Sequence, residues 1–181
     1  MHNFESQQTV KLSYALIILN IIFNYIFLTD IYRPHNIDDA WFLSLAYNLI
    51  KFDISDYDLM FNAGLSEGLL FFHKTGASLY GHFLDWLGWD YTKGRLLSFI
   101  LMGISGLFWF LTLKKLDFNL QSRVAFLLLF FYMEFSFTAT NSVRYETLVL
   151  ALQSFVLYLF FSRKYFFVGL VSTVSIECHP I

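Results

Sequence analysis

Five apolar runs divide this chain and constrain its fold more than any other feature. The first, "LSYALIILNIIFNYIFLT" at residues 12–29, is close to the roughly 20 residues that a helix needs to cross the hydrocarbon core of a bilayer. The remaining runs lie near residues 96–113, 124–139, 148–161 and 166–181. We therefore predict one all-α membrane domain over residues 1–181, a polytopic bundle of about five transmembrane helices.

The residue composition supports a membrane protein and excludes other classes. Hydrophobic residues make up 57% of the chain and charged residues 14%, whereas soluble domains carry about 25% charged residues. The 12 Lys and Arg residues are scattered and the net charge is -2, which excludes a nucleic-acid partner, because such proteins gather basic residues on one face. The single cysteine, Cys178, excludes an internal disulfide framework and a CxxC metal or redox motif.

The short connections between the runs predict the orientation in the membrane. Their basic residues fall on one side of the predicted bundle: Lys11, Lys114, Lys115, Arg123, Arg163 and Lys164. The opposite short loop, "TATNSVRYET", has only Arg144. The positive-inside rule then predicts a multi-pass protein of the cell (inner) membrane, with a cytoplasmic N-terminus and with residues 30–94 outside. An uncleaved anchor fits the first run better than a signal peptide, because no A-x-A-like site follows it.

The outer segment is expected to pack on the membrane. In "DDAWFLSLAYNLIKF", a stripe of large apolar residues recurs at helical spacing: Trp41, Phe42, Leu45, Leu49 and Phe52. This pattern predicts a membrane-surface helix near residues 38–52. A second helix is predicted around "GASLYGHFLDWLGW", whose Tyr80, Trp86 and Trp89 suit the headgroup boundary.

Two adjacent acids, Asp38 and Asp39, open the first of these helices, and two explanations compete for them. They can simply occupy the first turn after an Asn36 N-cap, where the helix macrodipole favours negative charge. Alternatively, a carboxylate held beside the membrane can take a proton from an acceptor group while a lipid-linked donor lies alongside. The residue pattern by itself favours the first explanation.

The order of four short motifs changes this weighting. The acidic pair with "AWFLSLAYNLI" follows the first span, and "FFHKTGASLYGHFLDWLG", "GRLLSFILMGISGLFWFLTLKKL" and "SVRYETLVLALQSFVLYLF" come after it. In this order they resemble the N-terminal part of the GT-C glycosyltransferases, in particular the protein O-mannosyltransferase and aminoarabinose-transferase-like groups. The last three are similar to the family's Lys-Pro-Pro-Leu stretch, its Arg-Leu-Leu second span and its Arg-Pro-Glu/Asp start of the fourth span. The resemblance covers most of residues 10–181.

The chain departs from the family pattern at three places. Asp39 stands where the second acid is often Glu, "KTGAS" lacks both prolines, and Tyr145 replaces the usual proline.

The resemblance implies the transfer of a sugar from a polyprenyl-phosphate carrier to an acceptor hydroxyl or amine on the outer face, usually with inversion. The acceptor is a protein, lipid or glycan. Asp38 would act as general base, and Asp39 would orient the acceptor or a divalent metal. Four residues would bind the substrate or hold the leaving phosphate: Lys74, Arg144, Glu146 and His179. No cofactor is implied with certainty, and no metal site is assigned, because the spacing of His35, His73 and His82 fits none.

Several of these residues also have purely structural explanations. Arg95 is a further candidate for holding the phosphate, but the preferred explanation is that Arg95 and Lys93 anchor the second span at the headgroups. Arg144 and Glu146 in "RYE" can form a local ion pair that contributes little at a wet surface. Glu134, within the third run, either faces a wet cavity on the side of Asp38 or is a hydrogen-bonded core acid.

The fifth apolar run continues to "SIECHPI" and no polar tail follows, so we expect a fragment of a longer multi-span protein. Two other functions stay open. One is a non-enzymatic transporter subunit or membrane assembly factor whose outer acids bind a cation or a partner. The other is an inactive, truncated relic of the enzyme.

Overall fold

The computed structural model describes residues 7–29, 37–53 and 74–178. Within these ranges every regular element is an α-helix, which confirms the all-α prediction. The helices are α1 (Gln7–Thr29), α2 (Ile37–Phe52), α4 (Lys74–Leu87), α5 (Tyr91–Lys115), α6 (Leu120–Tyr132), α7 (Glu134–Thr140), α8 (Glu146–Phe161) and α9 (Tyr165–Cys178).

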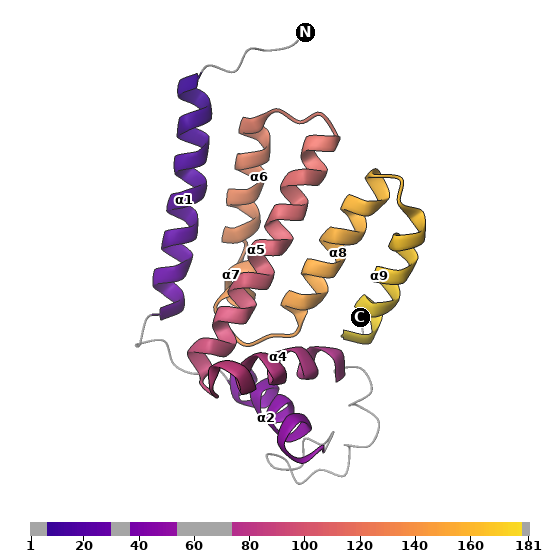
Figure 1. Cartoon of the computed structure of the whole chain (residues 1–181). Helices are drawn as coiled ribbons and strands as arrows, with labels where there is room; N and C mark the ends of the chain where they lie inside the picture. Colours follow the sequence, from indigo (N-terminus) through magenta and orange to yellow (C-terminus); the bar gives the residue numbers. More distant parts are fainter. Residues whose placement is uncertain (1–6, 30–36, 54–73, 179–181) are drawn as a thin grey trace.

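Five of the helices, α1, α5, α6, α8 and α9, run alongside one another (Figure 1). The α5–α6 and α8–α9 connections lie at one end of the bundle along the helix axes, and α2 and α4 lie across the opposite end. The closest packing is between α5 and α8, between α8 and α9, and between α2 and α4. The crossing pair α2 and α4 therefore closes one end of the bundle, next to the connection between α7 and α8.

Local signals in the sequence explain where α5 and α6 begin. The Asp90 carboxylate accepts a hydrogen bond from the Thr92 amide at 3.2 Å, which caps α5. The Asn119 side chain accepts one from the Ser122 amide at 2.8 Å, which caps α6. Lys114 and Lys115 occupy the last turn of α5, where the helix macrodipole favours positive charge.

By length and composition alone, two of the described helices could cross a membrane, namely residues 7–26 of α1 and all of α5. The apolar helices α6, α8 and α9 are shorter, so the five-span bundle stays a prediction. The predicted third run is not one continuous helix, because the backbone at Met133 is extended (φ -59°, ψ 138°) and separates α6 from α7. Neither proline nor glycine, the residues that usually mark a helix break, lies at this point.

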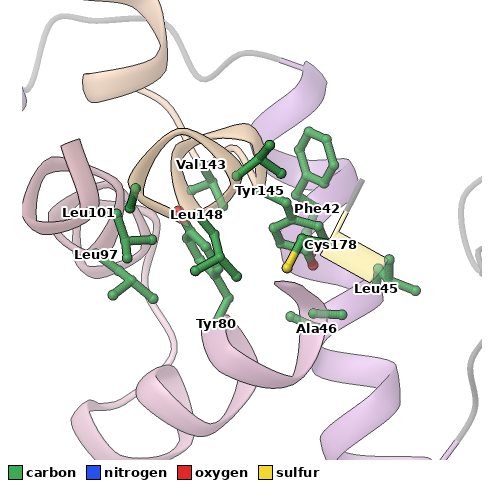
Figure 2. Close-up of a cluster of buried hydrophobic side chains, with 13 residues drawn as sticks. Phe42, Leu45, Ala46, Tyr80, Leu97, Leu101, Val143, Tyr145, Leu148 and Cys178 are labelled. Carbon is green, nitrogen blue, oxygen red and sulfur yellow. The ribbon is translucent and has the colours of Figure 1, made fainter. Parts of the chain in front are cut away.

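The predicted helix near residues 38–52 is confirmed as α2, but much of its apolar stripe faces protein. Phe42 and Leu45 are buried, whereas Phe52 is 56% exposed. The buried residues join a core cluster at the closed end of the bundle, which is shown in Figure 2. Its members are Phe42, Leu45, Ala46, Ala77, Tyr80, Leu97, Leu101, Val143, Tyr145, Leu148, Val149, Ala151 and Cys178.

Candidate functional site

Asp39 of the acidic pair ties three distant parts of the chain together. One carboxylate oxygen, Oδ2, accepts hydrogen bonds from Arg95 Nη2 at 2.5 Å and Arg95 Nε at 3.2 Å. The other, Oδ1, accepts the backbone N–H of Val143 at 2.5 Å. The carboxylate thereby joins α2, the start of α5 and the connection between α7 and α8.

This ion pair is buried, since the Asp39 and Arg95 side chains are 0% and 6% exposed. Burying two charges costs several kcal/mol per ion, and their attraction offsets that cost only if the remaining hydrogen-bonding atoms also find partners. Here the Val143 amide supplies a further partner for Asp39. The expectation that Arg95 anchors α5 at the headgroups is therefore wrong, because its guanidinium points into the protein and binds a carboxylate 56 residues earlier in the chain.

Tyr145 fastens α2 and α4 to the start of α8. Its hydroxyl donates to the backbone oxygen of Phe42 at 2.6 Å, and its ring packs on the Phe42 ring with centroids 4.6 Å apart. A Cβ atom at Gly76 of α4 would lie 2.7 Å from Tyr145 Cγ, closer than Cβ atoms come to their neighbours in real proteins. Gly76 of "KTGAS" and Tyr145 of "RYE" thus pack directly against each other.

A buried hydroxyl network lies beside this contact. Tyr80 Oη is 2.7 Å from Ser98 Oγ and 2.9 Å from Thr147 Oγ1, and it donates to the backbone oxygen of Arg144 at 3.0 Å. Burial raises the pKa of the Tyr80 phenol above its ordinary value, while the hydrogen bonds oppose this shift less strongly. Tyr80 is therefore a neutral donor that fixes the backbone just before Tyr145.

Arg144 and Glu146 flank Tyr145 and pair with each other. Arg144 Nη1 lies 3.5 Å from Glu146 Oε1, and both side chains are 22% exposed. Glu146 is in the first turn of α8, where the macrodipole favours a carboxylate. The local ion pair expected from "RYE" is thus present, and it leaves part of both side chains accessible at the closed end of the bundle.

Of the other predicted site residues, only some have side chains that the structure describes. Lys74 is exposed at the start of α4, two residues before the Gly76 that contacts Tyr145. Asp38 lies in the first turn of α2, although its side chain is outside the described residues, as is that of Glu134. His179 also lies outside the described residues, and the residue before it, Cys178, belongs to the core cluster.

The predicted residues that the structure describes therefore gather at one end of the bundle. Asp39, Arg144 and Glu146 are linked through the Val143–Glu146 segment, and α4 brings Lys74 to the same end. Among residues 7–29, 37–53 and 74–178, no group of three or more His, Cys, Asp or Glu side chains could hold a metal ion.

No protein-family model, curated protein or solved structure matches this chain. The likeness to the GT-C enzymes therefore depends only on the order of short motifs in the sequence.

Proposed function

We propose that the chain is the N-terminal part of a membrane glycosyltransferase of the GT-C type, which transfers a sugar from a polyprenyl-phosphate carrier to an acceptor on the outer face. The observation that supports it best is the buried contact of Asp39 with Arg95 and the Val143 amide. This contact holds the start of α2, where the acidic pair lies, against the segment that carries Arg144. A base and a phosphate-binding cation are thereby held at the same end of the bundle.

In this proposal the two acids have different tasks. Successive helix residues are about 100° apart around the axis, so Asp38 occupies a different face of α2 from the anchored Asp39. Asp38 is the general base, and Asp39 is a positioning residue because both of its oxygens accept hydrogen bonds from the protein. The family pattern likewise assigns the general-base role to Asp38.

The proposed reaction needs only a proton transfer and a displacement. The acceptor hydroxyl or amine gives its proton to the Asp38 carboxylate as it attacks the anomeric carbon of the sugar. The bond between that carbon and the phosphate oxygen breaks, and polyprenyl phosphate leaves with the electron pair. Lys74, Arg144 and His179 stabilise the negative charge that develops on the phosphate, while Glu146 orients Arg144.

The proposal includes a membrane arrangement of about five spans with a cytoplasmic N-terminus. Its support is that the α5–α6 and α8–α9 connections lie at one end of the bundle, and that five of the 12 Lys and Arg residues are in or beside them: Lys114, Lys115, Arg123, Arg163 and Lys164. The crossing helices α2 and α4, with the proposed site, lie at the opposite end. Two helices of suitable length and composition, in α1 and α5, agree with a membrane location.

One observation favours a non-enzymatic membrane subunit as the second candidate. Asp39 and Arg95 neutralise each other inside the protein, which is what a purely structural ion pair does. In that case Asp38 only starts a helix, and its charge has no effect on any transfer reaction.

The transfer reaction itself distinguishes these candidates. Membranes from cells that express the protein from its own gene are supplied with polyprenyl-phosphate mannose or aminoarabinose carrying a radiolabelled sugar. Asp38→Asn is expected to lower transfer by about 10²- to 10⁴-fold, the usual contribution of a general base. Asp53→Asn is the matched control, because Asp53 is an exposed aspartate just after α2 whose positive φ of 53° asparagine also adopts. Equal transfer by the two variants would contradict the proposal.

A further inference from the structure

A cavity of about 320 Å³ lies between α1, α5 and α6, away from the site described above. Its volume is at the lower end of the range of small-molecule sites, about 300–1,000 Å³. Along α5 the cavity extends over Phe99, Gly103, Gly106, Leu107 and Phe110. From Arg95 to Gly103 the helix rises about 12 Å, so the cavity is deeper in the bundle than the ion pair.

Two asparagines of α1, Asn20 and Asn24, line this otherwise apolar cavity. The side-chain nitrogen of Asn24 donates to Asn20 Oδ1 at 2.6 Å and to the Asn20 backbone oxygen at 2.9 Å. Because these two acceptors fix the amide orientation, Oδ1 is the Asn24 atom left to bind something else. Asn24 is 2% exposed, and its Oδ1 has no hydrogen-bond partner among the described residues.

An unsatisfied buried acceptor is costly, about 1–3 kcal/mol, and a polar side chain within a membrane-type helix usually serves a function. A single water is a poor occupant, since ordered waters need two to four polar partners and the cavity walls are largely apolar. A ligand with one hydrogen-bond donor and a hydrocarbon body satisfies both the acceptor and the walls. Among the described residues, no charged side chain lines the cavity, so a charged headgroup would find no partner there.

Gly103, which lines the cavity, leaves room for the hydrocarbon body of such a ligand. A Cβ atom built at Gly103 would have nothing within 4 Å, whereas one at Gly106 would meet the Phe131 ring at 2.7 Å. Gly103 therefore borders open space. Asn20 and Leu128 also line a second groove, formed by α1 and α6.

We propose that this cavity binds a single-chain lipid alcohol, with its hydrocarbon chain between α1, α5 and α6 and its hydroxyl donating a hydrogen bond to Asn24 Oδ1. The site is independent of the proposed sugar transfer, because it uses none of the residues assigned to that reaction.

The test uses the full chain in phosphatidylcholine nanodiscs and hexadecanol that carries a diazirine in mid-chain. Illumination is expected to label peptides of α1, α5 and α6 in a saturable manner, and unlabelled hexadecanol should compete while hexadecane does not. Labelling that does not saturate, or that hexadecane competes equally well, would overturn the proposal.

Two variants and a control locate the binding. Gly103→Leu fills the cavity and should reduce saturable labelling at least tenfold, with Gly103→Val as a smaller filler if the leucine variant does not fold. Gly169→Leu is the matched control, because Gly169 of α9 also has nothing within 4 Å of its ideal Cβ. Asn24→Leu removes the acceptor and should weaken apparent affinity roughly tenfold. If Gly103→Leu loses labelling but Asn24→Leu keeps the wild-type affinity, the hydroxyl is not recognised by Asn24. If Gly103→Leu and Gly169→Leu are labelled equally, the cavity is not the site.

Discussion

Asp39 and Arg95, 56 residues apart in the sequence, form a buried ion pair that fastens α2 to the start of α5. The ion pair places the acidic pair of the sequence at the closed end of the bundle. It also makes the stability of that end depend on two buried charges.

Removing one partner of this pair should destabilise the protein strongly. Arg95→Leu leaves the Asp39 carboxylate buried without its counter-charge, which typically costs about 3–5 kcal/mol. The free energy of unfolding in detergent micelles measures the effect. Lys51→Leu is the control, because the Lys51–Asp85 ion pair between α2 and α4 is largely exposed and its loss should change stability much less. Equal losses in the two variants would contradict the role assigned to burial.

A methyl group at Gly76 should also destabilise the closed end. In Gly76→Ala the new Cβ meets the Tyr145 ring at 2.7 Å, and such overpacking typically costs about 1–3 kcal/mol. Gly169→Ala, whose new Cβ has nothing within 4 Å, should instead be neutral or slightly stabilising, because alanine has a higher helix propensity than glycine. Thermal unfolding of the two variants checks this, and a Gly76→Ala protein as stable as Gly169→Ala would show that Tyr145 is not tightly packed.

Alkaline pH should weaken the Tyr80 network. The pKa of the Tyr80 phenol is raised in the folded protein. The contribution of the neutral phenol to the free energy of unfolding is therefore complete below the unfolded pKa of about 10 and is lost as pH rises above it. The loss is at most about 1.4 kcal/mol per pH unit. The stability difference between wild type and Tyr80→Phe, followed by unfolding from pH 8 to about 11.5, should therefore shrink above pH 10. Tyr47→Phe, which removes an exposed phenol, should show no such change, and a constant difference for Tyr80→Phe would refute the argument.

The proposed membrane orientation predicts opposite labelling at the two ends of the bundle. In a Cys178→Ala background, a membrane-impermeant maleimide should reach Trp86→Cys of α4 from outside intact cells and should reach Phe118→Cys only after lysis. Both positions are exposed, at 81% and 50%. Labelling of Phe118→Cys in intact cells would reverse the orientation and move the proposed site to the cytoplasmic side.

The sequence predicts the helices well because apolar periodicity and capping residues act locally. Asp90 and Asn119 mark the starts of α5 and α6, and the stripe from Trp41 to Phe52 marks α2. The break at Met133 carries no such signal. The sequence also does not show what α2 packs against. Its Phe42 and Leu45 pack on α4, α5 and α8, but the same apolar stripe would suit a membrane surface equally well.

The candidate site is less accessible to sequence reasoning because its contacts are long-range. Arg95 resembles an anchor at the end of a span, and only the fold shows that its partner is Asp39. The one signal in the sequence is the resemblance of "GRLL" to the Arg-Leu-Leu motif of the GT-C enzymes, and it does not name the partner. The contact between Tyr145 and Gly76 is likewise long-range, and no local pattern in the sequence predicts it.

The most direct test of the proposed function measures sugar transfer and unfolding free energy on the same preparations of Asp38→Asn and Asp39→Asn. Asp38→Asn should lower transfer by about 10²- to 10⁴-fold while leaving the free energy of unfolding near that of wild type. Asp39→Asn should lower the free energy of unfolding, because it leaves Arg95 buried without its counter-charge. If Asp38→Asn transfers sugar at the wild-type rate in a protein shown to be active, then Asp38 is not the general base and the acidic pair only starts and anchors a helix.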